Sequence, residues 1–292
     1  MRSTLWIPHG EDVLAATLHV PDGVWSVDAC VLFLAGPATN RGGPNRLHHR
    51  AAIALEHVGV PSLRFDYRGR GESTGDEESV CVPTMIEDTL AAKAAAVRAL
   101  GATPGRFVLV ANCLACVAEL RVLESAPDVS GGVFVAATQF AERQDTRHFW
   151  SELRYAAGAY SRKLVAPDLW RRVLEGKVDY AAVGRALFNS AARRYRSRIA
   201  DPSRRRYGIA PALPGKDARF LWGAHDPSSE ERAYYQRFCQ ERDWRGEFHV
   251  LPDADRSFGR AQSAARAIDV MVRWAFALAR GAAPAEPRRA LP

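Results

Sequence analysis

Short apolar runs alternate with longer alanine-rich stretches of helical periodicity through the first half of the chain. The apolar runs lie at 30–34, 61–65, 107–111, 132–136 and 219–222, and each is followed by glycine, alanine or polar turn residues. Helical periodicity begins near His48, Pro83, Cys113, Ser229 and Gln262. This alternation is typical of βαβ units on a mostly parallel sheet, so the pattern predicts an α/β fold. Residues 4–19 predict an antiparallel hairpin that turns near Gly10.

The alternation stops between about 139 and 214, where amphipathic runs rich in Trp, Tyr, Leu and Arg replace it. We expect residues 139–214 to form a helical lid inserted into one core made of residues 1–138 and 215–280. The last residues, 281–292, are mostly Ala, Pro and Arg, and they predict a disordered tail because they have little to bury.

Composition and charge limit the classes of partner and the cellular compartment that we expect. The formal net charge of +7 suits an acidic partner, such as nucleic acid, a phosphorylated small molecule or an acidic carrier protein. We expect no nucleic acid, since no recognised binding module accompanies the charge. No apolar run is long enough to span a membrane, and the N-terminus has no apolar secretion segment. Five cysteines, an odd number, do not suit a disulfide framework, which favours a reducing, cytoplasmic setting.

One cysteine lies at a junction between a predicted strand and a predicted helix. Residues 111–116 read ANCLAC, directly after the apolar run at 107–110. In a nucleophile elbow, small residues two places before and after the nucleophile let the strand and helix approach, and Ala111 and Ala115 are small. The elbow places the nucleophile at a helix N-terminus, which favours a thiolate. We therefore predict that Cys113 is a catalytic nucleophile, against the alternative of a buried structural cysteine.

The sequence around the other four cysteines gives less support for a catalytic role. Cys116 follows three residues after Cys113, and core packing is the simpler interpretation of it. A redox pair of Cys113 and Cys116 is the alternative, although the surrounding pattern is not that of a thioredoxin-like protein. We interpret Cys30, Cys81 and Cys239 as structural.

Two further segments carry a resemblance to a known superfamily. Residues 64–73 read RFDYRGRGES and residues 35–41 read AGPATNR. Together with the cysteine elbow, they resemble the α/β-hydrolase superfamily over residues 31–274. They are closest to the exosortase A system-associated hydrolases, a branch that includes members with a cysteine nucleophile. The resemblance implies the α/β-hydrolase fold, a mostly parallel sheet with helices on both faces.

The resemblance also assigns an acid and two oxyanion donors. Asp226 follows a late strand at the position of the catalytic acid, although a turn or helix-capping role before Pro227 is the alternative. The backbone N–H of Leu114 would donate to the oxyanion. A second donor is expected from residues 36–39, and we assign it to Ala38 because Pro37 has no N–H.

The expected catalytic histidine is missing. The family pattern places it directly after Asp255, where this chain has Arg256. An arginine side chain stays protonated, so it cannot act as the general base. We include Arg256 as a charge that supports a Cys113 thiolate. Among the histidines, His225 is the best alternative base because it adjoins Asp226, and His48, His49 and His148 are further candidates.

The densest cationic segment, at 193–206, contains Arg193, Arg194, Arg204 and Arg205. It would bind the phosphates of coenzyme A or an acyl carrier protein, or it is a solvated loop. The sequence therefore predicts an acyltransferase or condensing enzyme that takes an acyl group from such a thioester and uses no cofactor or metal. The alternatives are a thioesterase or esterase that uses another histidine, and a pseudo-hydrolase that only binds an acylated carrier.

Overall fold

The computed structural model describes residues 1–23, 25–101, 103–138 and 213–281. Its strands are β1 (Arg2–His9), β2 (Asp12–His19), β3 (Cys30–Leu34), β4 (Ser62–Phe65), β5 (Phe107–Asn112), β6 (Val129–Val135), β7 (Asp217–Gly223) and β8 (Arg245–Leu251). Its α-helices are α1 (Leu47–His57), α2 (Val82–Leu100), α3 (Ala115–Ser125), α8 (Arg232–Glu241) and α9 (Ala261–Arg280).

The described strands form one sheet in the order β1-β2-β4-β3-β5-β6-β7-β8. β1 pairs with β2, and β2 with β4, in antiparallel register, while every pair from β4 to β8 is parallel. The predicted hairpin is confirmed, and Gly10 takes the positive φ of 63° that its tight turn requires. Parallel strands present their carboxyl ends at one edge of the sheet, so the loops after β3, β5, β7 and β8 lie at the same edge.

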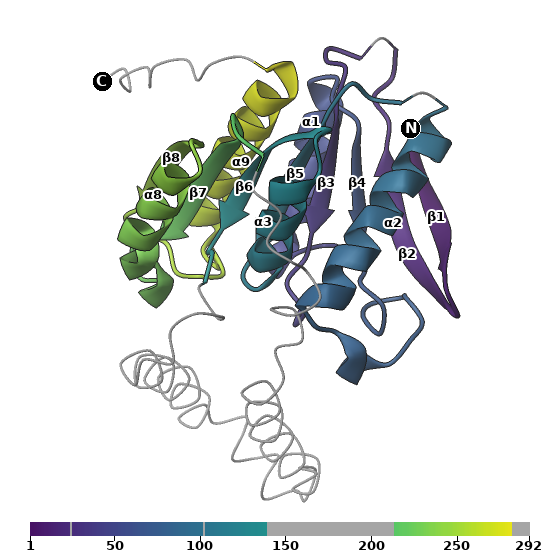
Figure 1. Cartoon of the computed structure of the whole chain (residues 1–292), viewed down its shortest axis with the longest axis horizontal. Coiled ribbons are helices and arrows are strands. Elements are labelled where there is room, and N and C mark those ends of the chain that lie inside the picture. Colours follow the sequence, from purple (N-terminus) through teal and green to yellow (C-terminus); the bar gives the residue numbers. More distant parts are fainter. Residues whose placement is uncertain (24, 102, 139–212, 282–292) are drawn as a thin grey trace, which may run out of the picture. The chain divides into compact units, whose positions relative to one another are not determined.

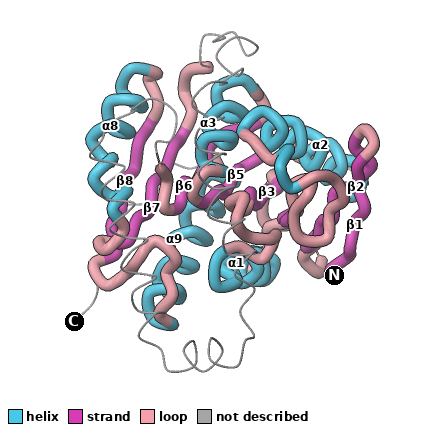
Figure 2. Tube along the Cα trace, turned by 90° about the horizontal axis from the view of Figure 1, so that it is seen from below, coloured by secondary structure: helices cyan, strands magenta, loops and turns pink. Residues whose placement is uncertain are grey.

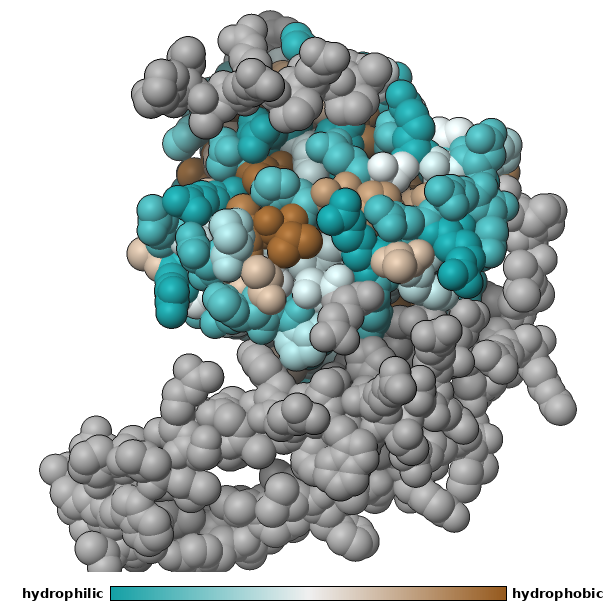
Figure 3. All heavy atoms as spheres, turned by 90° about the vertical axis from the view of Figure 1, so that its left-hand side faces the viewer, coloured by the Kyte–Doolittle hydropathy of each residue, from teal (hydrophilic) through white to brown (hydrophobic). Residues whose placement is uncertain are grey.

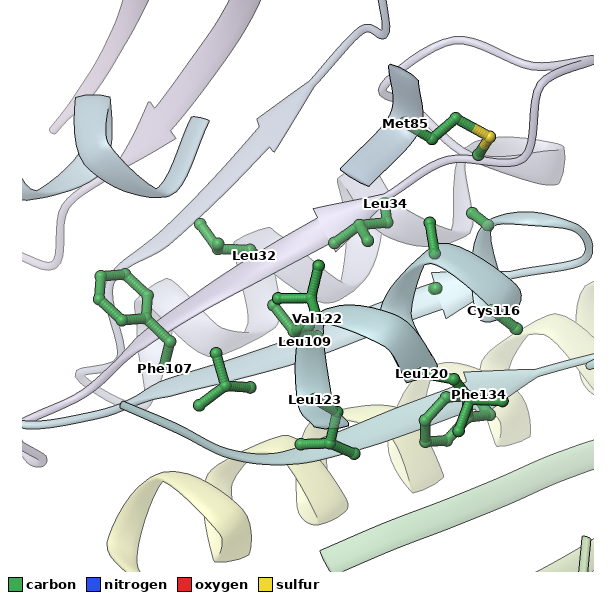
Figure 4. Close-up of a cluster of buried hydrophobic side chains, with 14 of the residues drawn as sticks. Leu32, Leu34, Met85, Phe107, Leu109, Cys116, Leu120, Val122, Leu123 and Phe134 are labelled. Carbon is green, nitrogen blue, oxygen red and sulfur yellow. The ribbon is translucent and has the colours of Figure 1, made fainter. Parts of the chain in front are cut away.

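Helices cover both faces of this sheet (Figures 1 and 2). α2, α3 and α8 lie on one face, and α1 and α9 lie on the other. Each face has its own core of buried side chains, and all residues of β3 and β5 are buried, as expected for central strands covered on both sides. In the core beneath α2 and α3, Cys116, Leu120 and Leu123 of α3 pack with Leu109 and Phe134 of the sheet (Figure 4).

The five predicted strands are present, with ends that differ by up to three residues. The parallel strand β8 is additional to those five. It lies at the edge of the sheet and alternates exposed and partly buried residues, so it has no continuous apolar run. Two helices begin slightly later than predicted: α3 begins at Ala115, two residues after Cys113, and α8 begins at Arg232, after a 3₁₀ segment, Pro227–Glu231, that contains Ser229. Nearly all of the predicted lid, residues 139–212, lies outside the described residues, as do 282–292 of the predicted tail.

The surface at the β8 end of the sheet is mostly hydrophilic, with a small group of hydrophobic side chains among the polar ones (Figure 3). Phe248 and Val250 of β8 are partly buried and pack against the core. No helix in the described part of the chain has the length and apolar character needed to cross a membrane.

Candidate active site

Cys113 lies in a strained turn between β5 and α3. Its φ of 56° falls in the left-handed region, which few residues other than glycine adopt. Such a conformation costs on the order of 1–3 kcal/mol and persists only where the surroundings enforce it. The Cys113 N–H donates to the Val135 carbonyl at 3.0 Å, and the flanking Ala111 and Ala115 are fully buried. The predicted elbow geometry is therefore present, with a partly exposed cysteine at its tip.

The loop after β3 lies directly against this elbow. The Gly36 N–H donates to the side-chain oxygen of Asn112 at 3.1 Å, in a buried hydrogen bond. A Cβ atom at Gly36 would lie 3.0 Å from the Asn112 amide nitrogen and 3.4 Å from the Cys113 Cβ atom, so only glycine fits without displacement. Asn112 therefore fastens this loop to the elbow.

The two predicted oxyanion donors lie on these two segments. Residues 36–39 form a turn in which the Thr39 N–H donates to the Gly36 carbonyl at 2.9 Å, and Ala38 lies inside that turn. Leu114 immediately precedes α3, and no side chain caps this helix end. Within the described residues, neither the Ala38 N–H nor the Leu114 N–H donates to a protein acceptor. The role of both groups as oxyanion donors stays a prediction.

Asp226 and Arg256 form an ion pair at the ends of β7 and β8. The Arg256 Nε atom donates to an Asp226 carboxylate oxygen at 3.1 Å. The Asp226 side chain is fully buried, and 22% of the Arg256 side chain is exposed. Ser228 adds two hydrogen bonds to Asp226, from its hydroxyl at 2.7 Å and its N–H at 3.0 Å. Asp226 therefore caps the short 3₁₀ segment, as the structural alternative predicted, and also binds Arg256.

The loop that carries Arg256 is held in place by several hydrogen bonds. The His225 N–H donates to the Ala254 carbonyl at 2.9 Å, and the Asn45 amide donates to the Ser257 carbonyl at 2.8 Å. Burial alone would raise the pKa of Asp255, but hydrogen bonds from Gly259 and Ser257 outweigh it and hold that pKa below its ordinary value. Asp255 therefore stays ionised and closes the loop beside Arg256.

A cleft of about 430 Å³ opens beside Ala38. Its lining comes from the loop after β3, through Thr39, Asn40 and Asn45, and from Arg70 and Gly71 after β4. Asn45 also donates to the Ser257 carbonyl, so one residue that lines the cleft is hydrogen-bonded to the loop that carries Arg256. Three residues of the site were not predicted from the sequence. Asn45 and Asn112 bind partners that are distant in the chain, and Ser228 binds Asp226 within a local turn of ordinary composition.

No described histidine is hydrogen-bonded to Asp226, whose partners in the described residues are Ser228 and Arg256. The His225 side chain is exposed. His48 is buried against Phe33, and burial together with the Arg64 charge lowers the pKa of His48 to about 3. Burial and nearby arginine charges also lower the pKa of His49. His148 and the arginines Arg193, Arg194, Arg204 and Arg205 lie outside the described residues, and the described part contains no cluster suited to a metal ion.

Comparison with known proteins identifies the fold. Neither a protein-family model nor a curated protein sequence matches the chain. Among solved structures, the esterase Pf2001 of Pyrococcus furiosus is similar, with a TM-score of 0.58 and 16% identity over 94% of this chain and 93% of that one. A dienelactone hydrolase of Anabaena variabilis has a TM-score of 0.59 and 14% identity, covering 94% of this chain and 96% of that one.

A third similar structure, XC6422 of Xanthomonas campestris, is described as an α/β serine hydrolase without a lid. It has a TM-score of 0.57 and 15% identity, over 97% of each chain. Identities this low show the fold alone, so the resemblance to the exosortase A system-associated branch stays a prediction. The chain has the α/β-hydrolase fold.

Proposed function

We propose that the protein is an acyl-transfer enzyme in which Cys113 takes an acyl group from a thioester and passes it to an acceptor other than water. The observation that carries this proposal is the hydrogen bond from Arg256 to Asp226, at the place where the superfamily pattern expects a histidine. The elbow supplies a nucleophile position, while Asp226 has no histidine partner among the described residues.

The candidate site has an elbow half, made of Cys113, Leu114 and the loop with Ala38, and an acid half, made of Asp226 and Arg256. Formation of the acyl-enzyme requires only groups of the elbow half. The N-terminus of α3, with no side-chain cap, stabilises negative charge on the Cys113 sulfur. The thiolate attacks the thioester carbonyl, and the N–H groups of Leu114 and Ala38 stabilise the oxyanion. When this intermediate collapses, the bond to the donor sulfur breaks and the donor leaves as a thiolate. No protein base takes part in this step.

Release of the acyl group separates transfer from hydrolysis. Water must lose a proton as it attacks, and a guanidinium that is bound to Asp226 and always protonated cannot accept that proton. An acceptor that is already nucleophilic, such as a thiolate, amine or carbanion, attacks without such a base, and an amine can pass its proton to the departing Cys113 thiolate. The acyl-enzyme therefore favours these acceptors over water.

The donor is a thioester of coenzyme A or of an acyl carrier protein. Both carry phosphates, and the net charge of +7 favours an acidic ligand. The arginines at 193, 194, 204 and 205 are the proposed phosphate ligands. The reaction requires no cofactor, and the odd number of cysteines in the sequence favours a reducing compartment such as the cytoplasm.

A hydrolase that uses His225 is the second candidate. His225 directly precedes Asp226, its side chain is exposed, and the similar structures include an esterase and hydrolases. This candidate predicts that the acyl-enzyme turns over in water with a rate that rises as the imidazole loses its proton.

Intact-protein mass spectrometry after incubation with a short acyl-coenzyme A tests the proposal. The parent should carry one persistent acyl group, and Cys113→Ala should carry none. The variant Cys81→Ala is the matched control, because Cys81 is the other cysteine with an accessible side chain and should not affect labelling. An acyl group that survives Cys113→Ala, or no acyl group from any of several donors, would remove the covalent mechanism and favour a binding protein.

A further inference from the structure

We propose that Cys113 and Cys116 form a redox-active dithiol, which a peroxide converts to an intramolecular disulfide and a small dithiol restores. This modification site goes beyond acyl transfer and does not depend on it. It uses the cysteine pair of the elbow, of which the acyl-transfer reaction uses one member.

The backbone places the two cysteines close together. The Cys116 N–H donates to the Cys113 carbonyl at 3.1 Å and closes a four-residue turn. The ends of such a turn have Cα atoms within about 7 Å of each other. Disulfides span Cα distances up to almost the same limit, so this turn is compatible with a disulfide after modest adjustment.

The Cys116 sulfur lies beneath the Cys113 backbone. It points to the Val135 carbonyl oxygen at 3.7 Å, and the Cys113 N–H donates to that same oxygen at 3.0 Å. The contact made by the Cys116 thiol is a weak hydrogen bond, so a rotation of the side chain toward Cys113 loses little interaction free energy. Figure 4 shows Cys116 at the start of α3 among hydrophobic side chains.

The two sulfurs differ in accessibility. Cys113 is partly exposed at the tip of the elbow, whereas Cys116 is fully buried. Burial, with the nearby Glu119 and Cys113, raises the pKa of the Cys116 thiol well above its ordinary value. Cys113 is therefore the sulfur that meets a peroxide first, and Cys116 is held as a protonated thiol directly behind it.

The chemistry proceeds in two balanced steps. The Cys113 thiolate attacks hydrogen peroxide, the O–O bond breaks, and the products are a sulfenic acid on Cys113 and hydroxide. The hydroxide formed in the first step accepts the proton of the Cys116 thiol and becomes water. The Cys116 thiolate then attacks the Cys113 sulfur, the S–O bond breaks, and hydroxide leaves, so the disulfide forms without a protein base. A dithiol such as dithiothreitol reduces it by exchange.

The chain offers a direct readout. Trypsin cleavage after Arg106 and Arg121 releases residues 107–121, which contain Cys113 and Cys116 and no other cysteine. Reduced full-length protein is treated with hydrogen peroxide, free thiols are alkylated, and this peptide is weighed. In the parent, we expect a peptide lighter by two hydrogens and without alkylation, which dithiothreitol returns to two alkylated thiols.

Two variants make the inference falsifiable. In Cys116→Ser and Cys116→Ala, Cys113 should proceed to sulfinic and sulfonic acids that dithiothreitol does not reverse. Both variants should form the acyl adduct like the parent when reduced, which also reports that the elbow is folded. If the native parent accumulates the same acids as the variants, or forms the disulfide only in urea, the inference is wrong. Because the disulfide is measured without acyl donor, its failure is distinct from failure of acyl transfer.

Discussion

The elbow half and the acid half of the candidate site keep different amounts of hydrolase geometry. The elbow half combines a left-handed Cys113, small flanking residues and the adjoining loop held by Asn112. The acid half keeps a buried carboxylate after β7, but Arg256 binds it in place of an imidazole. The elbow geometry is therefore present in one half, whereas in the other an arginine binds the carboxylate where the sequence resemblance places a histidine.

The largest effect on stability is expected in the acid half. Arg256→Met leaves the buried Asp226 carboxylate with Ser228 as its described partner and should lower the free energy of unfolding by about 3 kcal/mol. Arg266→Met is the matched control, since its ion pair with Asp253 is exposed and contributes about 0.5 kcal/mol or less. Urea unfolding measures both free energies. Equal losses would show that the Asp226–Arg256 pair contributes no more to stability than an exposed ion pair.

A pH-dependent effect is expected beneath the elbow, at Glu119 of α3. Burial raises the pKa of Glu119 well above its ordinary value, although backbone groups of Val133 and Ala111 oppose this. With a raised folded-state pKa, the contribution of Glu119 to stability is complete below the unfolded value of about 4.3 and is lost as pH rises through the folded value.

The variant Glu119→Gln does not titrate at this position. It should therefore gain stability over the parent as pH rises from about 4, by up to about 1.4 kcal/mol for each unit by which the pKa is raised. Urea unfolding across pH measures the difference. Glu241→Gln, at a site with 62% of its side chain exposed, should follow the parent at every pH. Parallel profiles for Glu119→Gln and the parent would contradict the burial argument.

A smaller effect distinguishes the two hydrogen bonds that fasten the loop after β3, one to the elbow and one to the loop that carries Arg256. Asn112→Ala removes the acceptor for the Gly36 N–H and should slow acyl-adduct formation about tenfold, equivalent to about 1.4 kcal/mol of barrier. Asn45→Asp removes the corresponding donor to the Ser257 carbonyl on the acid half and should leave that rate within about twofold. Rapid-quench mass spectrometry measures both rates. Equal rates in the two variants would mean that the Asn112 hydrogen bond does not position the oxyanion loop.

The smallest effect is expected at His225. Since Arg256 binds Asp226 and His225 is exposed, His225→Ala should leave both acyl-adduct formation and transfer to a thiol unchanged. A loss of about a hundredfold in release of the acyl group would identify His225 as the general base and establish the hydrolase candidate instead.

Most of the sheet could be predicted because its central strands are buried on both faces. β3 and β5 are mostly continuous apolar runs, and such runs can be recognised from the residue types alone. β8 lies at the sheet edge and mixes exposed polar residues with Phe248 and Val250, so its pattern is weaker. α3 begins at Ala115, later than the periodicity predicted, because Cys113 takes a left-handed conformation that helical periodicity does not reveal.

The site was predictable where one local pattern carries it. Cys113, Asp226 and Arg256 each follow a recognisable strand end, and the structure brings Asp226 and Arg256 together. Asn112 binds Gly36, 76 residues away along the chain, and Asn45 binds Ser257, 212 residues away. Such partners depend on how the loops meet at the sheet edge, and no local pattern of residue types specifies them.

The fate of a preformed acyl-enzyme distinguishes acyl transfer from hydrolysis. Parent and Arg256→His are acylated at Cys113, freed of excess donor, and followed by intact mass in water alone and with a small thiol acceptor. The parent adduct should persist in water and disappear with the thiol, and Arg256→His should lose its adduct in water on the order of a hundredfold faster than the parent. Equally rapid loss of the parent adduct in water and with the thiol would contradict the proposed acyl transfer.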